Sequence, residues 1–475
     1  MRRRDFLKVV GAGAVSLAIP GRPGNATQSS AKRKPNFVFI FIDDMGFKDP
    51  GFMGSRYYET PNIDKLAGEG VVFTNAYSNA PNCAPTRACL MSGQYTPRHG
   101  IYTVGTSERG RSKLRKLIPT PNETNLDSKV VTIPESLKPA GYTSACIGKW
   151  HLGGKSPYRP VDRGFDVAFE RRHGGHFSKD GEYLTDRLTD EAIKFIEANK
   201  AGPFFLYLAH HAVHTPIQAK KQLIEKYEKK KPTDAHNNPT YAAMIENVDQ
   251  GVGRIMAKLD EQGLRDNTVV FFFSDNGGHA NFTSMIPLRG SKGMLYEGGI
   301  RVPMIVRWPG TVKPGGVCDV PVMGIDFYPT MLELARARRP AGHILDGLSI
   351  VPLLKGKGTL NREAIFWHFP AYLESYNEKQ WPWRTTPAGA VRRGDFKLIE
   401  FFEDGKVELY NLKDDLGEKN NLAGTMPDKA EELHRTLVEW RKSVKAPVPA
   451  EKNPQYDPQA VKAGMPGAGK KKVKK

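Results

Sequence analysis

Uninterrupted apolar runs, separated by helical segments, constrain the fold of this 475-residue chain more than any other feature. The clearest runs are NFVFIFI (36–42), PFFLYLA (203–209), TVVFFF (268–273) and VPMIVRW (302–308). Continuous runs of this kind are typical of strands that are buried on both faces of a parallel sheet. A further strand is expected at VVFTNAY (71–77).

Amphipathic helices are predicted between these strands. The clearest pattern lies in residues 241–263, where apolar side chains recur every three or four positions and therefore share one helix face. These side chains are Ile245, Val248, Val252, Ile255 and Leu259. Shorter helices are expected at 62–70 and 189–200, and residues 132–150 indicate a helix, a turn at Gly141 and a strand.

The alternation of strands and helices predicts an α/β fold, with a large mixed, mostly parallel sheet sandwiched by helices. Towards the C-terminus the pattern changes. Residues 390–402, a turn at Asp404–Gly405 and residues 406–412 indicate an antiparallel hairpin. We therefore expect a large domain over residues 34–355 and a smaller C-terminal α+β domain, containing an antiparallel sheet, over residues 356–445.

Both ends of the chain differ from this body. Residues 1–30 begin with RRRDFLK and continue with an apolar run at 9–19, which is shorter than the roughly 20 residues of a bilayer span. A basic start before a short apolar run is typical of an export signal, and Arg3 and Arg4 stand in a sequence that resembles the twin-arginine motif. A plain disordered basic terminus is the alternative.

The signal predicts the location of the protein. We expect the Tat export machinery to carry it to the periplasm or the outside of a bacterial cell, with no stable membrane insertion. At the other end, residues 446–475 are rich in Pro, Gly and Lys, so we expect a disordered basic tail.

The chain carries a formal net charge of +19 at pH 7. The signal supplies +3 and the C-terminal KKKVKK supplies +5, which leaves about +11 on the body. A basic body attracts anionic partners. No zinc-finger spacing or RNA-binding signature accompanies this charge, so we expect no nucleic acid partner.

Acidic side chains follow two of the predicted strands. Asp43 and Asp44 come directly after the first strand, and Asp275 and Asn276 come just after the strand at 268–273. Because ligands bind beyond the carboxyl ends of parallel strands, these residues are expected to meet at one rim. An all-oxygen donor set suits a hard divalent cation and favours calcium over zinc. Each pair taken alone is also common as a helix cap or a turn.

Cys83 stands four residues before Arg87, and its spacing bears on three explanations. A disulfide to Cys89 conflicts with a helix, because six residues advance about 9 Å and a disulfide needs Cα atoms within about 7 Å. A tyrosine-phosphatase loop needs arginine at position 89, where the chain has cysteine. A single activated thiol at a helix N-terminus remains open.

The surrounding motif resembles a known family. CAPTR (83–87), followed by LMSG (90–93), is similar to the maturation motif of the type I, formylglycine-dependent sulfatases, an arylsulfatase-like family of the alkaline phosphatase superfamily. Threonine stands at position 86, where serine is usual. Other matching motifs, in order, are GYTSACIGKWH (141–151), VHTP (213–216), SDNGG (274–278) and GSKGMLYEGGIRVP (290–303). The likeness covers roughly residues 35–425.

The resemblance implies a calcium-dependent sulfatase and assigns roles to matching positions. In this family a formylglycine-generating enzyme oxidises the motif cysteine to formylglycine, an aldehyde. The catalytic residues implied for this chain are Cys83, Arg87, Lys149, His151, His214 and Lys292. The residues implied to bind one Ca²⁺ are Asp43, Asp44, Asp275, Asn276 and residue 83, through the hydrate of its aldehyde.

The implied chemistry follows from the charge of a sulfate ester. Ca²⁺ and three cationic side chains neutralise the sulfate as its S–O bond stretches. One hydroxyl of the hydrated aldehyde attacks sulfur, with Asp275 as a candidate to take its proton. His214 or Lys292 protonates the departing alcohol. His151 then takes the proton of the second hydroxyl, so that the aldehyde re-forms and releases sulfate.

The sequence leaves three functions open. The first is an exported sulfatase that acts on a sulfated carbohydrate. The second is a phosphoric or phosphonic ester hydrolase of the same superfamily, and the third is a non-catalytic binder of sulfated glycans, against which the intact catalytic set argues. Four residues of the second domain either line a sugar site or form an interdomain contact, and these are Trp381, Trp383, His368 and Arg384.

Overall fold

The main sheet of the protein is built around β1 (Asn36–Ile42), whose side chains are all buried. The computed structural model describes residues 33–170, 175–376 and 381–463. The other strands of this sheet are β2 (Val71–Phe73), β4 (Thr143–Gly148), β5 (Val167–Phe169), β6 (Phe204–Ala209), β7 (Thr268–Ser274), β8 (Met304–Arg307) and β9 (Gly316–Cys318). Their order among the described residues is β5-β4-β6-β1-β7-β8-β2-β9.

Within this described sheet, β1 runs parallel to both of its neighbours, β6 and β7. Only β8 is antiparallel to the strands beside it. The sheet is therefore mixed and mostly parallel, which confirms the predicted fold class.

Smaller sheets lie outside the main one. Their strands are β3 (Ala76–Tyr77), β10 (Val322–Met323), β11 (Ala364–Phe369), β12 (Leu373–Glu374), β13 (Trp383–Thr385), β14 (Ala388–Arg393), β15 (Phe396–Phe401) and β16 (Val407–Asn411). Strands β11, β14, β15 and β16 form an antiparallel sheet in that order. This sheet supplies the predicted C-terminal α+β part, together with the α-helix that packs on it.

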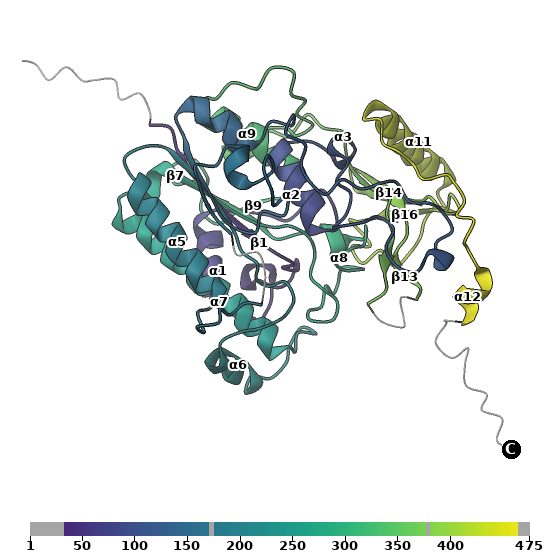
Figure 1. The fold of residues 1–475 in the computed structure, drawn as a ribbon, viewed down its shortest axis with the longest axis horizontal. Helices are drawn as coiled ribbons and strands as arrows, with labels where there is room; N and C mark the ends of the chain where they lie inside the picture. Colours follow the sequence, from purple (N-terminus) through teal and green to yellow (C-terminus); the bar gives the residue numbers. More distant parts are fainter. Residues whose placement is uncertain (1–32, 171–174, 377–380, 464–475) are drawn as a thin grey trace, which may run out of the picture. The chain divides into compact units, whose positions relative to one another are not determined.

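The α-helices of the described residues lie mostly against these sheets (Figure 1). They are α1 (Pro61–Glu69), α2 (Cys83–Ser92), α3 (Thr96–His99), α4 (Ile133–Leu137), α5 (Leu184–Asn199), α6 (Lys221–Glu228), α7 (Pro239–Glu261), α8 (Glu297–Ile300), α9 (Phe327–Ala335), α10 (Val351–Leu354), α11 (Pro427–Ser443) and α12 (Pro458–Ala463). Helix α6 packs instead on α7, and α12 packs on the segment Ser112–Leu114. Helix α11 packs on the antiparallel sheet through Leu433 and Leu437.

Alternate side chains of β1 face two separate cores, as a period of two along the strand requires. Val38 and Ile40 point to the face that is covered by α1, α5 and α7. Phe39 and Phe41 point to the opposite face, which is covered by α2, α4 and α9. Both faces of the strand are therefore dry, which explains why its sequence is continuously apolar.

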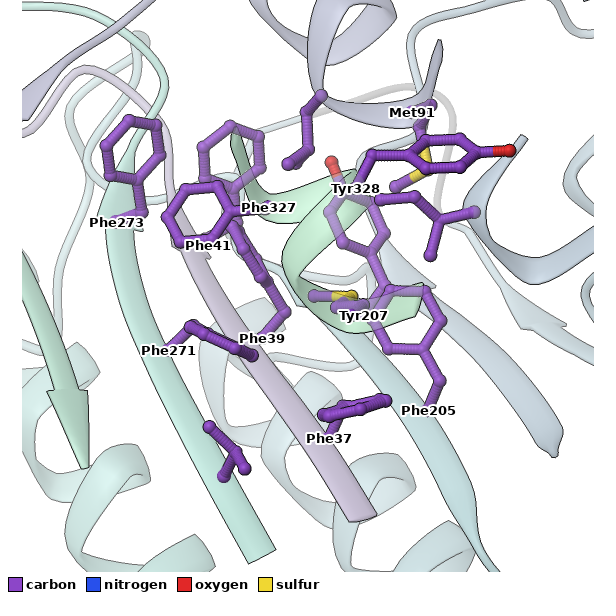
Figure 2. Close-up of a cluster of buried hydrophobic side chains, with 14 of the residues drawn as sticks. Phe37, Phe39, Phe41, Met91, Phe205, Tyr207, Phe271, Phe273, Phe327 and Tyr328 are labelled. Carbon is purple, nitrogen blue, oxygen red and sulfur yellow. The ribbon is translucent and has the colours of Figure 1, made fainter. Parts of the chain in front are cut away.

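Figure 2 shows the aromatic side chains of the second core. Phe39 and Phe271, from neighbouring strands, meet Phe327 of α9, and the Phe39 and Phe327 ring centroids lie 4.8 Å apart in edge geometry. Each fully buried Phe stabilises the fold by about 1.5–3 kcal/mol. Met91 of α2 lies in the same cluster, so the helix that begins at Cys83 is anchored to the sheet.

Two predicted strands are divided in the structure. Residues 71–77 form β2 and β3, which belong to different sheets, because the chain turns at Thr74–Asn75. Residues 390–402 form β14 and β15, because Gly394 adopts a φ of 59° and turns the chain. The predicted turn at Asp404–Gly405 is present between β15 and β16.

The C-terminal prediction of disorder over residues 446–475 is wrong for the described part, which ends at residue 463. Asn453 is buried, and its side-chain Nδ2 donates to the carbonyls of Ser112 and Arg115 at 2.8 and 2.9 Å. Helix α12 follows at once. Composition alone did not indicate that this segment is ordered. Its polar residues hold it in place through hydrogen bonds with the backbone, and it has no apolar face that a sequence pattern would show.

Two expectations fall on residues that lie outside the described ranges. These are the export signal at 1–30 and the last part of the basic tail, from residue 464. No helix in the described ranges has the length and apolar character needed to cross a membrane. The boundary expected between residues 355 and 356 stays a prediction.

Candidate active site

Two strand ends bring the predicted acidic residues together. Strands β1 and β7 pair to their last residues, so Asp43 and Asp275 emerge at the same rim of the sheet. The N–H of Asp44 donates to Asp275 Oδ1 at 3.1 Å, and Asn276 Nδ2 donates to Asp44 Oδ1 at 2.8 Å. All four side chains are buried, and Asp44 has a φ of 65°, a strained conformation that clusters at functional sites.

Helix α2 presents Cys83 and Arg87 to this rim. Asn82 caps the helix in an extended conformation, and Gly93 ends it with a φ of 67°, a conformation that glycine favours. Residues four positions apart lie on the same helix face, so the two side chains are neighbours. Both are buried, with exposed fractions of 1% and 0%.

The guanidinium of Arg87 joins separate segments of the site. Its Nη2 lies 2.8 Å from Asp275 Oδ2, and its Nη1 donates to the carbonyl of Lys149 at 2.8 Å. Its Cζ lies 4.8 Å from the centre of the Phe41 ring. Burial and the negative charge of Asp43 raise the pKa of Asp275 to about 7, although Arg87 opposes this shift.

Two lysines form ion pairs with the carboxylates of Asp43 and Asp44. Lys149, just after β4, donates from Nζ to Asp43 Oδ2, and Lys292 Nζ lies 2.7 Å from the carboxylate of Asp44. Burial opposes ionisation of both carboxyl groups, but the cations around them outweigh it and lower the pKa of Asp43 and of Asp44. The Lys292 N–H donates to the carbonyl of Gly278 at 3.0 Å, which holds its loop beside the end of β7.

Two histidines border the same cluster. Burial, followed by the charge of Lys149, lowers the pKa of His151 to about 2, so its imidazole is neutral. His214 Nδ1 lies 2.7 Å from the carbonyl of Thr215. Because a carbonyl only accepts hydrogen bonds, this nitrogen carries a proton. His214 Nε2 lies 3.8 Å from Asp44 Oδ2, and its side chain is 31% exposed.

A cavity of about 880 Å³ opens beside these side chains. Among the residues that line it are Lys149, His151, His211, His214, Asn125 and Tyr158. His211 Nε2 is buried and has no hydrogen-bond partner among the described residues, and burial lowers the pKa of His211 to about 3. The cavity therefore offers neutral polar groups, next to a strongly charged floor, for a hydroxyl-bearing ligand.

Cys83 itself is not an activated thiolate. Burial and the charge of Asp43 raise the pKa of its thiol to about 12, so the sulfur stays protonated at neutral pH. The direction of this shift disfavours the activated-thiol alternative. All four cysteines are free, and Cys83 and Cys89 lie on one helix, as the spacing argument requires.

The donor set at the rim fits a hard divalent cation. Ligand atoms that lie within 4.8 Å of one another belong to Asp43, Asp44, Cys83 and His214. Oδ1 of Asp43 and Oδ1 of Asn276 are buried and have no hydrogen-bond partner among the described residues. Two such oxygens beside the Asp44 carboxylate are the hard ligands that calcium prefers. Asp275 has both oxygens engaged by protein groups.

The four residues that were considered for a sugar site do not form one cluster. His368, Trp381 and Trp383 each use a ring nitrogen to contact a backbone carbonyl of another segment. These contacts serve the fold. Arg384 differs, because its side chain lies against Gly293 in the loop that carries the predicted catalytic lysine.

Sequence reasoning missed three residues near the site. Tyr207 places its hydroxyl 3.3 Å from Arg87 Nη1, and it is hidden in an apolar strand. The ring centroids of His279 and Tyr376 lie 3.9 Å apart. His279 directly follows the SDNGG motif, which is the one signal that could have found it.

The geometry agrees with the comparison to known families. The sequence model of the family described as Sulfatase matches residues 35–337, and that of N-sulphoglucosamine sulphohydrolase, C-terminal, matches residues 291–443. The chain belongs to the sulfatase family and is a sulfuric ester hydrolase. This confirms the family that the motifs indicated.

Individual relatives span nearly the whole chain. A sulfatase of Formosa agariphila is 34% identical, with 92% of this chain and 94% of the relative covered. The N-acetylgalactosamine-6-sulfatase of Mus musculus is 30% identical, with coverage of 89% and 88%. The crystal structure of Ps i-CgsB in complex with k-i-k-neocarrahexaose is 30% identical and has a TM-score of 0.73, with coverage of 86% and 93%.

Proposed function

We propose that this sulfatase depends on calcium, uses a formylglycine made from Cys83, and removes sulfate from a sulfated carbohydrate. One observation carries the proposal: the cations of Arg87, Lys149 and Lys292 converge with oxygen donors around the single small side chain of residue 83. Fixed charges of this kind stabilise a sulfuryl group as negative charge develops on its oxygens.

Each group has a distinct part. Formylglycine at position 83 would supply, as its hydrate, one hydroxyl to attack sulfur and a second that lets sulfate leave. Calcium would supply further positive charge at the sulfate oxygens, and the residues proposed to hold it are Asp43, Asp44, Asp275, Asn276 and residue 83. Arg87, Lys149 and Lys292 would bind the remaining sulfate oxygens.

The pKa, hydrogen bonding and exposure of three side chains indicate which proton each of them would accept or donate. His151 is neutral because burial lowers its pKa, so it can accept the proton of the second hydroxyl of residue 83. Asp275, whose pKa burial raises to about 7, is suited to take the proton of the attacking hydroxyl. His214 is oriented by its Nδ1 contact with Thr215 and is partly exposed, so as an imidazolium that also carries a proton on Nε2 it would protonate the departing alcohol from Nε2.

A carbohydrate substrate is supported by two features. The cavity of about 880 Å³ presents neutral polar side chains such as Asn125 and Tyr158, which suit sugar hydroxyls. Two relatives, N-acetylgalactosamine-6-sulfatase and the structure that holds k-i-k-neocarrahexaose, are named for sulfated or carrageenan-type sugars.

The test starts from protein that was made together with a formylglycine-generating enzyme. Conversion of cysteine to formylglycine lowers the mass of the peptide that contains residue 83 by about 18 Da, as bond chemistry requires. Active enzyme should yield the lighter, converted form of this peptide. It should also hydrolyse an aryl sulfate faster than the matching phosphate diester. Cys83→Ala should fold and lack turnover. Active enzyme that carries only unmodified cysteine would refute the proposal.

We also propose that the protein is exported through the Tat machinery and that the formylglycine-generating enzyme acts on it before export. The support is the twin-arginine sequence of the first 30 residues, followed by its short apolar run. The destination would be the periplasm or the outside of a bacterial cell.

A further inference from the structure

Arg384 lies at the edge of the candidate sulfate site. It belongs to β13, and the neighbouring Thr385 donates from Oγ1 to the carbonyl of Gly293. A Cβ atom on Gly293 would stand 2.7 Å from Arg384 Nε, and Gly293 has a φ of 91°. The positive φ favours glycine at this position, and the absence of a side chain there lets the guanidinium lie against the loop that carries Lys292.

Aromatic side chains support this guanidinium. Its Cζ lies 3.6 Å from the centre of the Tyr376 ring, and the Tyr376 ring lies against that of His279 in a tilted arrangement, with centroids 3.9 Å apart. The Lys292 N–H donates at 3.0 Å to the carbonyl of Gly278, the residue before His279, and Arg384 lies against Gly293, the residue after Lys292. The side chains of His279, Tyr376 and Arg384 therefore form a wall next to the Asp44 and Lys292 pair.

The charge of Arg384 is unpaired, unlike that of the cations in the sulfate site. Arg87, Lys149 and Lys292 each have a carboxylate within 4.0 Å. Arg384 has no such partner among the described residues, and its Nε and Nη1 are buried there without a hydrogen-bond partner. Burial, followed by the positive charge of Arg109, lowers its pKa to about 10.

A buried guanidinium without an acceptor is unfavourable, and an anion that reaches it removes the cost. Guanidinium groups match carboxylate and sulfate oxygens through paired N–H donors. We propose that Arg384 binds a second anionic group of the substrate, next to the sugar that carries the reacting sulfate ester. This inference rests on the proposed function, and it narrows the substrate to sulfated carbohydrates with at least two anionic groups.

The test measures how much a second anion improves binding. Sulfated sugars are assayed as competitive inhibitors of aryl sulfate hydrolysis: galactose 6-sulfate as the singly charged ligand, and disaccharides that add either a carboxylate or a second sulfate. At least one of the doubly charged ligands should bind ten-fold or more tightly than galactose 6-sulfate. The two arms distinguish a carboxylate from a sulfate as the group that Arg384 binds.

Arg384→Gln should reduce the ratio of the affinity for the doubly charged ligand to that for galactose 6-sulfate at least ten-fold. Arg384→Lys should keep part of this ratio. The melting temperature of Arg384→Gln should stay level or rise, because an unpaired buried charge is removed. Arg254→Gln, which removes a cation from the exposed side of α7, is the matched control and should leave the ratio unchanged. Weaker binding of all ligands by one common factor, or no gain from any second anion, would overturn the inference.

Calorimetric titration of the Cys83→Ala protein with the same ligands gives this comparison without any turnover. A failure of the proposed function would be recognised by a different result from a failure of the Arg384 inference. In that case, matured enzyme that carries formylglycine would hydrolyse no sulfate ester.

Discussion

Lys292 Nζ lies 2.7 Å from the carboxylate of Asp44, although the two residues are 248 positions apart in the chain. The contact joins the loop after β7 to the turn after β1. Burial opposes the lysine charge, but Asp44 outweighs it and raises the pKa of Lys292. The amine is therefore charged at neutral pH, and it is held at the rim by a residue of the proposed metal site.

Replacement of Lys292 tests the electrostatic part of the proposed reaction. Lys292→Ala should lower kcat/KM for an aryl sulfate by about 10²–10³, the usual cost of one fixed donor to a developing oxyanion. Lys313→Ala, which removes an exposed lysine, should leave the rate near that of the wild type. Steady-state kinetics of the two purified variants provides the comparison. Equal activity of Lys292→Ala and Lys313→Ala would remove Lys292 from the site.

Calcium should stabilise the folded protein. Among the described residues, the buried Oδ1 atoms of Asp43 and Asn276 have no hydrogen-bond partner, and calcium would ligate them only in the folded state. Binding to the folded state alone adds about 2.7 kcal/mol at one hundred times Kd, so calcium should raise the melting temperature and a chelator should lower it. Asp275→Ala should lose metal content and activity, whereas the exposed Asp266→Ala should keep both. Retention of both by Asp275→Ala would contradict the proposed ligand set.

Export should depend on the arginines of the signal. Changing Arg2, Arg3 and Arg4 together to lysine keeps the charge but removes the guanidinium pair that the twin-arginine motif requires. The triple variant should accumulate inside the cell, as cell fractionation and immunoblotting would show. Arg33→Lys, just after the signal, should be exported normally. Normal export of the triple variant would exclude this route.

The main sheet was predictable because its physical cause is local. A strand that is buried on both faces needs consecutive apolar residues, and β1, β6 and β7 all show them. The division of residues 71–77 between two sheets was not predictable, since both halves are apolar and only their partners differ. Asn453 was missed for a similar reason: its burial depends on carbonyls more than 300 residues away.

The candidate site was predictable where short motifs place side chains at strand ends. Asp43 and Asp275 follow two strands, and the register of these strands brings them together. The spacing of Cys83 and Arg87 gave their common helix face. The sequence indicated Arg384 only as one of four candidates for a sugar site, and nothing local separates it from the other three, because only the folded chain brings it to Gly293.

The C-terminal segment should support the loop beneath it. Asn453→Ala would remove the side-chain donor from the carbonyls of Ser112 and Arg115. The Ser112 carbonyl would keep the N–H of Arg115, so the cost of about 1–3 kcal/mol for an unsatisfied buried group applies to the Arg115 carbonyl. Hydrogen exchange of residues 112–116 should therefore accelerate in this variant. Asn420→Ala, which changes an exposed asparagine, serves as control. Unchanged exchange in Asn453→Ala would mean that the segment is not needed to hold the loop.

A buried charge cluster links α8 to the antiparallel sheet. Lys397 Nζ lies 2.9 Å from both Glu297 Oε1 and Glu418 Oε1, and all three side chains are fully buried. Two carboxyl groups thus share one ammonium. Burial raises the pKa of Glu418 to about 7, with the charge of Glu297 acting in the same direction and Lys397 opposing it.

This shift predicts how stability depends on pH. The folded pKa of Glu418 lies above the ordinary value of 4.5, so the folded state binds the proton more tightly than the unfolded state does. The contribution of Glu418 to the free energy of unfolding is then complete below pH 4.5 and is lost as pH rises through 7, with a slope of up to about 1.4 kcal/mol per pH unit. Glu418→Gln cannot titrate, so the stability of the wild type relative to this variant should fall steadily between pH 5 and pH 7. Urea unfolding at several pH values measures the difference, with the exposed Glu431→Gln as control. A difference that stays constant over this range would show that Glu418 is ionised throughout and that Lys397 satisfies both carboxylates.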